Sequence, residues 1–204
     1  MKALKAVVLG ISITCSGAIS VIADADTPAQ GSGIEGATAA AADGTAPSPC
    51  DSVRVEASLL LAGGWHAAET ADERKQRLEA IDEVTDDLGR LKRGKARSRL
   101  ADRTSPPPSL VIEMKGPRVT IVTGDDRLEL ELGGSPIEVS ESDAKAQVSA
   151  RMECERLIVV ALSDNGERTT TYRADEDGLS MEVVLTSASI AGPLRYTTTY
   201  ARAE

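Results

Sequence analysis

The sequence predicts a mainly β protein: an antiparallel up-and-down meander that forms a closed or nearly closed barrel, with one N-terminal amphipathic helix. Two observations lead to this fold class. After the triple proline at residues 106–108, apolar and polar side chains alternate along nine short segments. Glycine, aspartate and proline turn signals separate these segments, and no helical pattern interrupts them. Closing the sheet removes its exposed edges, so a barrel is favoured over an open sheet.

The predicted meander spans residues 109–203. Because tight turns join its segments, neighbours in sequence should pair antiparallel. Asp164-Asn165-Gly166 is a strong hairpin signal between two of them. The nine strands are expected near residues 110–114, 119–123, 128–132, 137–140, 144–152, 157–162, 168–174, 179–186 and 194–202.

One helix is predicted over about residues 70–103, before the meander. Thr70 followed by Glu73 forms a capping box, which marks its start. Acidic residues dominate 69–88 and basic residues dominate 89–103, an order that suits the helix dipole. The apolar positions recur at spacings of three and four: Leu78, Ile81, Val84, Leu88 and Leu91.

The basic end of this helix is the candidate surface for a ligand or partner. Its cations could meet an anionic component of the cell envelope, such as lipid head groups, or an acidic protein. The alternative is a solvated helix end that complements its own dipole. The surface consists of Arg90, Lys92, Arg93, Lys95, Arg97, Arg99 and Arg103.

The segment 53–61 precedes the helix and has apolar residues at every second position, which predicts a strand. A short helix competes with this prediction, because residues 57–62 could also coil. The strand would end at Gly63-Gly64-Trp65. Residues 50–204 are expected to form a single domain.

Residues 1–25 have the pattern of a signal peptide: Lys2 and Lys5, an apolar stretch, and a small-x-small cleavage pattern ending at Ala25. We therefore expect export to the periplasm or the extracellular space and no transmembrane span in the mature chain. Lipid attachment at Cys15 is disfavoured, because Thr14 precedes it. Residues 26–49, rich in Ala, Gly, Ser and Pro, predict a flexible leader.

Two cysteines remain after cleavage, Cys50 and Cys154. In an oxidising compartment an even number of cysteines favours pairing, so a Cys50–Cys154 disulfide is predicted. Two buried free thiols are the alternative.

Most catalytic chemistry is disfavoured. The chain has one histidine, His66, and no Cys-x-x-Cys pair, phosphate-binding loop or nucleophile elbow, so we expect no catalytic site, metal or cofactor. A carboxylate-based hydrolase is the remaining enzymatic alternative, although a sugar cleft normally uses more aromatic rings than the four present. The net charge of -9 argues against nucleic-acid binding.

Residues 57–204 resemble lipocalin-like secreted bacterial proteins of unknown function. The resemblance rests on Gly63-Gly64-Trp65, on the Asp-Glu-Asp-Gly turn at 175–178 and on the final segment Leu-Arg-Tyr-Thr-Thr-Thr-Tyr at 194–200. In lipocalins a Gly-x-Trp motif introduces the first barrel strand, whereas a helix is expected to follow Trp65 here. Trp65 is therefore expected to be a packing residue. Thr169-Thr170-Thr171-Tyr172 recurs at residues 197–200 and places threonine and tyrosine on like faces of two strands.

These observations predict an exported, non-catalytic β-barrel module that binds a small apolar ligand. An aliphatic interior would suit a lipid or acyl chain. The alternative function is a structural or interaction protein of the cell envelope that docks a partner through the basic helix end.

Overall fold

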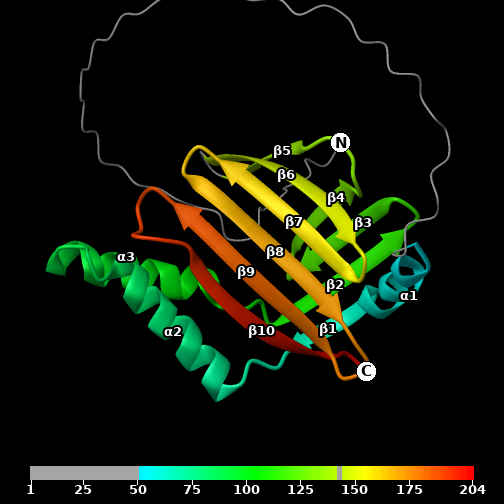
Figure 1. Cartoon of the computed structure of the whole chain (residues 1–204), viewed down its shortest axis with the longest axis horizontal. Helices are drawn as coiled ribbons and strands as arrows, with labels where there is room; N and C mark the ends of the chain where they lie inside the picture. The colour runs from blue at the N-terminus through cyan, green and yellow to red at the C-terminus, as the bar shows by residue number, and fades with distance from the viewer. Residues whose placement is uncertain (1–50, 142–143) are drawn as a thin grey trace, which may run out of the picture.

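The computed structural model describes residues 51–141 and 144–204, and these residues form three helices and ten strands (Figure 1). All strands belong to one sheet, in the order β4-β3-β2-β1-β10-β9-β8-β7-β6-β5. The helices are α1 (Asp51–Leu61), α2 (Ala71–Thr85) and α3 (Arg90–Thr104). The strands are β1 (Gly63–Ala67), β2 (Ser109–Lys115), β3 (Arg118–Thr123), β4 (Asp126–Glu131), β5 (Ile137–Glu141), β6 (Ala144–Glu153), β7 (Arg156–Ser163), β8 (Gly166–Ala174), β9 (Leu179–Ser187) and β10 (Leu194–Arg202).

The fold is an antiparallel meander that forms a nearly closed barrel, so the predicted fold class is confirmed. Strands β2 to β10 occupy the nine predicted segments. The two ends of the sheet, β4 and β5, come close to each other without pairing as strands. Just after β4, Leu132 forms a parallel bridge with Ala150 of β6, and Gly133 N donates to the carbonyl oxygen of Ala150 at 2.8 Å. The sequence did not predict β1, which lies between β2 and β10 and places Trp65 opposite Leu110 and Arg202.

The prediction of a strand over residues 53–61 is wrong, because this segment is helix α1. Ala57 and Leu61, four residues apart, are 4% and 0% exposed and belong to the hydrophobic core. A helix brings these two side chains to one face, whereas the alternating pattern of the segment fits both structures. The contacts with the end of the barrel therefore select the helix.

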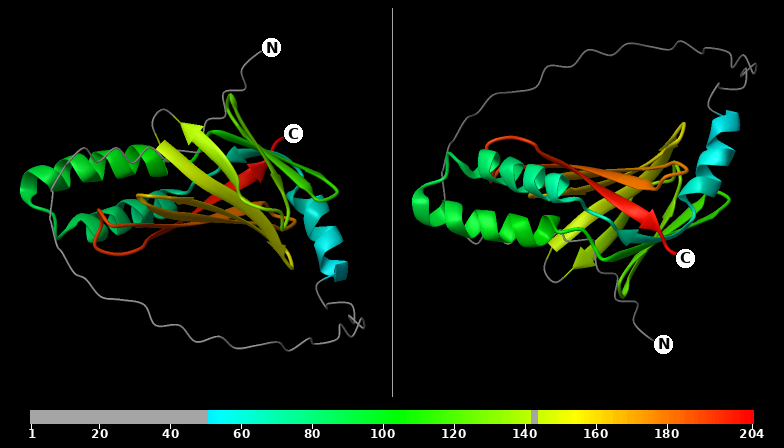
Figure 2. Two further views of the ribbon diagram at one scale, coloured as in Figure 1. Left: turned by 90° about the horizontal axis from the view of Figure 1, so that it is seen from above. Right: turned by 90° about the horizontal axis from the view of Figure 1, so that it is seen from below.

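The predicted helix over 70–103 is divided into α2 and α3, which lie side by side at one end of the barrel, while α1 lies at the opposite end (Figures 1 and 2). The break falls at residues 86–89. Gly89 is the N-cap of α3, and its carbonyl oxygen accepts hydrogen bonds from the backbone N–H groups of Lys92 and Arg93. The division lets both helices fold back against each other rather than extend away from the barrel.

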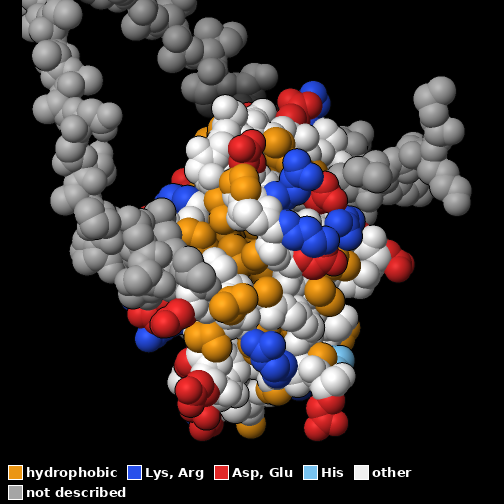
Figure 3. Space-filling model, turned by 90° about the vertical axis from the view of Figure 1, so that its right-hand side faces the viewer, with side chains coloured by type: hydrophobic (Ala, Val, Ile, Leu, Met, Phe, Trp, Pro, Cys, Tyr) orange, Lys and Arg blue, Asp and Glu red, His pale blue; other side chains and the backbone are white. Residues whose placement is uncertain are grey.

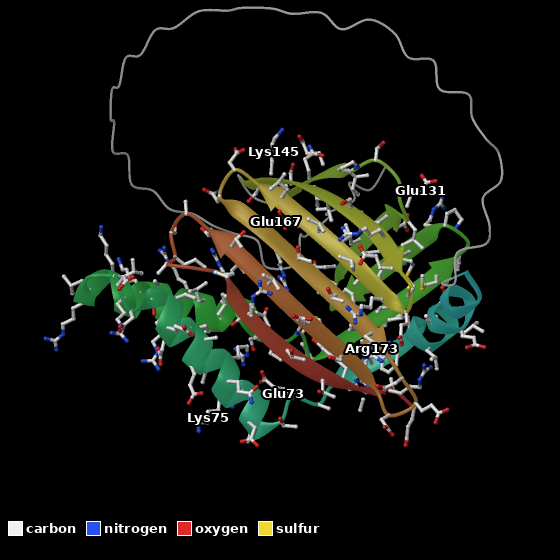
Figure 4. The ribbon with its side chains drawn as sticks, viewed as in Figure 1. Glu73, Lys75, Glu131, Lys145, Glu167 and Arg173 are labelled. Atoms are coloured by element: carbon white, nitrogen blue, oxygen red, sulfur yellow. The ribbon has the colours of Figure 1, made fainter. Side chains whose placement is uncertain are left out.

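The capping box starts α2 as the sequence predicts. Glu73 N donates to Thr70 Oγ1 at 3.2 Å, and Thr70 N donates to Glu73 Oε2 at 2.7 Å. The second carboxylate oxygen of Glu73 accepts a hydrogen bond from the hydroxyl of Thr199 on β10, so one side chain both caps the helix and ties it to the barrel wall (Figure 4).

The core lies inside the barrel and extends to both ends, where α1 and α2 contribute apolar side chains. Figure 3 shows the α1 end, where hydrophobic side chains lie among acidic and basic ones. Leu59 of α1 is 71% exposed. Among the described residues, no helix combines the length and the apolar character needed to cross a membrane.

The predicted signal peptide (1–25), the leader (26–49), Cys15 and Cys50 lie outside the described residues.

Candidate functional site

A polar cluster lies on the inner faces of β8 and β10. The pairing register places Arg168 opposite Leu185 of β9, which in turn pairs with Leu194 of β10; Leu194 is a core residue, and Leu185 packs against the core. Since side chains alternate along a strand, every second residue from Arg168 and from Leu194 also faces inward. The polar members of this inner face are Arg168, Thr170 and Tyr172 on β8 and Tyr196, Thr198 and Tyr200 on β10.

The cluster is buried in an aliphatic interior. Thr198 and Tyr200 are 0% exposed, and Tyr172 is 2% exposed. Arg168 is half-buried, and its Nε atom is buried. The surrounding inner faces carry aliphatic side chains, among them Leu157, Val159, Leu179, Met181, Val183 and Leu194. Several hydroxyls and the Nε atom of one cation are therefore held within a volume of low polarity, where electrostatic interactions are stronger than in water.

Electrostatic effects link the members of the cluster. Burial raises the pKa of Tyr172 to about 12, and the Arg168 guanidinium opposes this increase. Burial also raises the pKa of Tyr196 and of Tyr200, and the charge of Arg168 again lowers both. The three phenols are therefore neutral hydrogen-bond donors near a guanidinium at neutral pH, an arrangement that can receive an anion.

Two hydroxyls of the cluster have no hydrogen-bond partner within the described parts of the chain: Thr198 Oγ1 and Tyr200 Oη. A buried polar group without a partner typically costs about 1 to 3 kcal/mol. The cluster thus has unused donors that point into the barrel interior, and a bound polar group would satisfy them.

A buried ion pair lies at the α2 end of the cluster. Arg77 Nε donates to Glu69 Oε1 at 2.8 Å, and Arg77 Nη1 donates to Thr104 Oγ1 at 3.2 Å, which joins α2 to the end of α3. The charges of both Arg77 and Glu69 reach Tyr196 and affect its pKa. The ion pair therefore lies close enough to Tyr196 for its charges to act on that phenol.

A groove of about 520 Å³ runs along this ion pair. Its size falls within the range of pockets that hold small ligands. Arg77 and Glu69 contribute to its lining together with Arg74, Leu78, Ala101, Asp102, Ser105 and Pro106. The groove is thus a mixed polar and apolar hollow beside the ion pair whose charges affect Tyr196.

None of the predicted site residues belongs to this cluster. The seven predicted cations all lie on α3 or in its last turn. Trp65 packs at the α1 end, where it is 1% exposed. Its Nε1 atom donates to the carbonyl oxygen of Leu61, and the Arg202 guanidinium lies 4.6 Å from the centre of its ring.

Cys154 lies in the turn between β6 and β7, with a φ of 50°. Its predicted partner Cys50 is outside the described residues, so the disulfide stays a prediction. His66 is exposed on β1. Within residues 51–141 and 144–204, no three His, Cys, Asp or Glu side chains are grouped as metal ligands would be. Asp175 accepts hydrogen bonds from the backbone N–H groups of Asp177 and Gly178, a turn-forming role.

The sequence analysis missed Arg168 but found part of the signal. The repeated Thr-Thr-Thr-Tyr segments do place Thr170, Tyr172, Thr198 and Tyr200 on one face of the sheet. Arg168 stands two residues before Thr170 and four before Tyr172, in the same inward phase. A cation at an inward position of a strand is the signal that could have indicated the site.

The pKa of Tyr172 predicts how stability depends on pH. Because the folded-state pKa is raised from 10 to about 12, the unfolded chain ionises first as the pH increases. The contribution of the neutral Tyr172 phenol to the free energy of unfolding is fully present below pH 10. It is lost as the pH rises toward 12, and the loss is on the order of 2 to 3 kcal/mol. Urea unfolding followed by circular dichroism at several alkaline pH values measures this loss. The Tyr172→Phe variant should lose less unfolding free energy over this pH range than the parent protein does. An equal loss in both would show that Tyr172 is not the group responsible.

Comparison with known proteins finds distantly similar solved structures but no sequence family. No protein-family model and no curated protein matches the sequence. Human cRBP IV is 17% identical, with coverage of 70% of this chain and 98% of that chain and a TM-score of 0.44. The REP1-NXSQ fatty acid transporter is 13% identical, with coverage of 71% and 96% and a TM-score of 0.42. A Schistosoma mansoni fatty acid binding protein in complex with arachidonic acid is 13% identical, with coverage of 72% and 99% and a TM-score of 0.44.

All three matches are below 20% identity and have TM-scores below 0.5. The secreted and bacterial character implied by the sequence resemblance stays a prediction.

Proposed function

We propose that this protein is a non-catalytic binding module whose barrel takes an aliphatic ligand with an anionic head group, such as a fatty acid. The observation that carries the proposal is the polar cluster on the inner faces of β8 and β10. Thr198 and Tyr200 have buried hydroxyls without a partner among the described residues, and Tyr200 lies near enough to Arg168 for its charge to lower the pKa of the phenol. A carboxylate accepts hydrogen bonds from a guanidinium and from hydroxyls at the same time. The aliphatic side chains around the cluster suit the chain of such a ligand.

The orientation of the ligand follows from the same geometry. The head group of the ligand would lie against Arg168 and the tyrosines. The aliphatic chain of the ligand would contact the leucines and valines on the inner faces of the barrel strands. The groove along α2 and α3 offers the path of entry, because its Arg77 and Glu69 lie near enough to affect Tyr196. Entry would then require the helix pair to move relative to the barrel.

Binding of dodecanoate, measured by calorimetry, tests the proposal. Arg168→Gln should weaken binding roughly 10- to 150-fold, because a hydrogen bond to a charged group contributes about 1.5 to 3 kcal/mol. Arg173→Gln is the matched control: Arg173 lies on the same strand, but it is 53% exposed and pairs with Glu155 on the outside (Figure 4). Its affinity should equal that of the parent protein.

Two further measurements separate recognition of the ligand's head group from burial of its aliphatic chain. Dodecanol should bind more weakly than dodecanoate to the parent protein and equally to Arg168→Gln. Tyr200→Phe should weaken dodecanoate binding without lowering the free energy of unfolding, since its hydroxyl has no partner within the described residues. Equal binding of the acid and the alcohol by the parent protein would contradict the role of the cluster, and no binding of either would contradict the function.

A further inference from the structure

Helix α3 is held against α2 along one side. On the side that faces α2, Arg93 Nη1 pairs with Asp86 at 2.6 Å, and Arg97 Nε pairs with Asp82 at 2.7 Å. Leu100 and Ala101 pack against the core on the same side. These contacts hold the helix in place and use two of its cations internally.

The first two turns of α3 are mostly exposed and basic, and they carry one large apolar side chain. Arg90, Lys92 and Lys95 are exposed and form no ion pair within the described residues. Leu91 lies among them in the sequence and is 91% exposed. These residues directly follow the turn between α2 and α3, which projects from the barrel (Figure 1). We call Arg90, Leu91, Lys92 and Lys95 the α3 patch.

We propose that the α3 patch docks the protein on an anionic lipid surface. The three cations match the charge of acidic head groups, and each basic residue near such a surface raises the binding constant about fivefold. Leu91 can enter the boundary between head groups and acyl chains, as apolar residues of interfacial helices do. A lipid surface fits better than a protein pocket, because the patch consists of long mobile side chains around a single exposed leucine.

The charge of the whole chain sets the orientation. With a net charge of -9, most of the molecular surface is repelled by an anionic membrane, whereas residues 90–103 contain seven bases and one acid. Contact is therefore expected through α3, which presents the α2–α3 end of the barrel to the lipid. The docking does not depend on ligand binding by the barrel and can be tested without a ligand.

Sedimentation with vesicles tests the proposal with the full chain. One set of vesicles contains equal parts of phosphatidylglycerol and phosphatidylcholine, and the other contains phosphatidylcholine alone. The measured quantity is the ratio of the two partition coefficients, because the apolar segment 6–22 would bind both kinds of vesicle. Replacing all three cations (Arg90→Gln, Lys92→Gln and Lys95→Gln) should lower this ratio about 100-fold, and glutamine preserves helix propensity.

A matched control removes the same charge elsewhere. Lys75→Gln, Lys115→Gln and Lys145→Gln change three lysines whose side chains are 73%, 79% and 69% exposed on other elements. The ratio should change much less than for the α3 patch. Leu91→Ser should weaken binding to anionic vesicles while the ion pairs of Arg93 and Arg97 keep the helix folded, which circular dichroism checks. A ratio near one for the parent chain, or an equal drop for both triple variants, would overturn the proposal.

Discussion

Replacing Trp65 with alanine is expected to lower the free energy of unfolding by about 3 to 5 kcal/mol. The side chain is 1% exposed, so its removal leaves a large cavity at the α1 end of the core. The substitution also removes the hydrogen bond from Trp65 Nε1 to the carbonyl oxygen of Leu61. It further removes the contact between the Trp65 ring and the Arg202 guanidinium. Helix α1 should therefore be the first element to lose its contact with the barrel.

Guanidinium unfolding followed by far-ultraviolet circular dichroism measures the effect, because the variant lacks the one tryptophan of the chain. Trp65→Phe keeps an aromatic ring but loses the hydrogen bond, so its loss should be smaller than that of alanine. Leu91→Ala is the control for an exposed apolar residue and should stay within about 0.5 kcal/mol of the parent protein. A change below about 1 kcal/mol for Trp65→Ala would contradict its role in the core.

Replacing Arg77 with alanine is expected to cost about 3 to 5 kcal/mol, because it leaves the Glu69 carboxylate buried without its partner. The two side chains are 5% and 13% exposed, and the guanidinium also holds Thr104 at the end of α3. The variant should thus loosen the attachment of both helices to the barrel. Thermal unfolding followed by circular dichroism measures the loss.

A double variant separates the ion pair from simple packing. Arg77→Met with Glu69→Gln removes both charges and should recover most of the stability that Arg77→Ala loses. Lys75→Ala breaks an exposed pair with Glu79 at 3.8 Å and should cost less than about 0.5 kcal/mol. If the double variant is no more stable than Arg77→Ala, the stability lost in Arg77→Ala does not come from a buried unpaired charge.

The sequence was most informative where local patterns and tertiary structure agree. The capping box at Thr70 and Glu73 forms both predicted hydrogen bonds. The alternation after residue 108 predicted nine strands correctly, because a strand with one buried face must place apolar residues at every second position. The repeat of Thr170–Tyr172 at Thr198–Tyr200 likewise showed which residues share a face.

The sequence was least informative where one pattern fits two structures. Ala57 and Leu61 satisfy both the strand and the helix period, and only the open end of the barrel selects the helix. Strand β1 is five residues long and contains two glycines, so it has little alternation to detect. Glu73 illustrates the same point within one side chain: its capping role is local, but its hydrogen bond with Thr199 joins residues 126 positions apart.

The sheet, its antiparallel order and the basic character of α3 could be predicted from the amino-acid sequence, because these features depend on side-chain period, turn residues and charge along a short stretch of chain. The grouping of Arg168 with the tyrosines of β10 and the packing of Arg77 against Glu69 could not be predicted in this way. Both arrangements depend on the closure of the barrel and on the packing of the helix pair, which bring together residues from distant segments. Electrostatic fields in the interior depend on those distances and not on spacing along the chain.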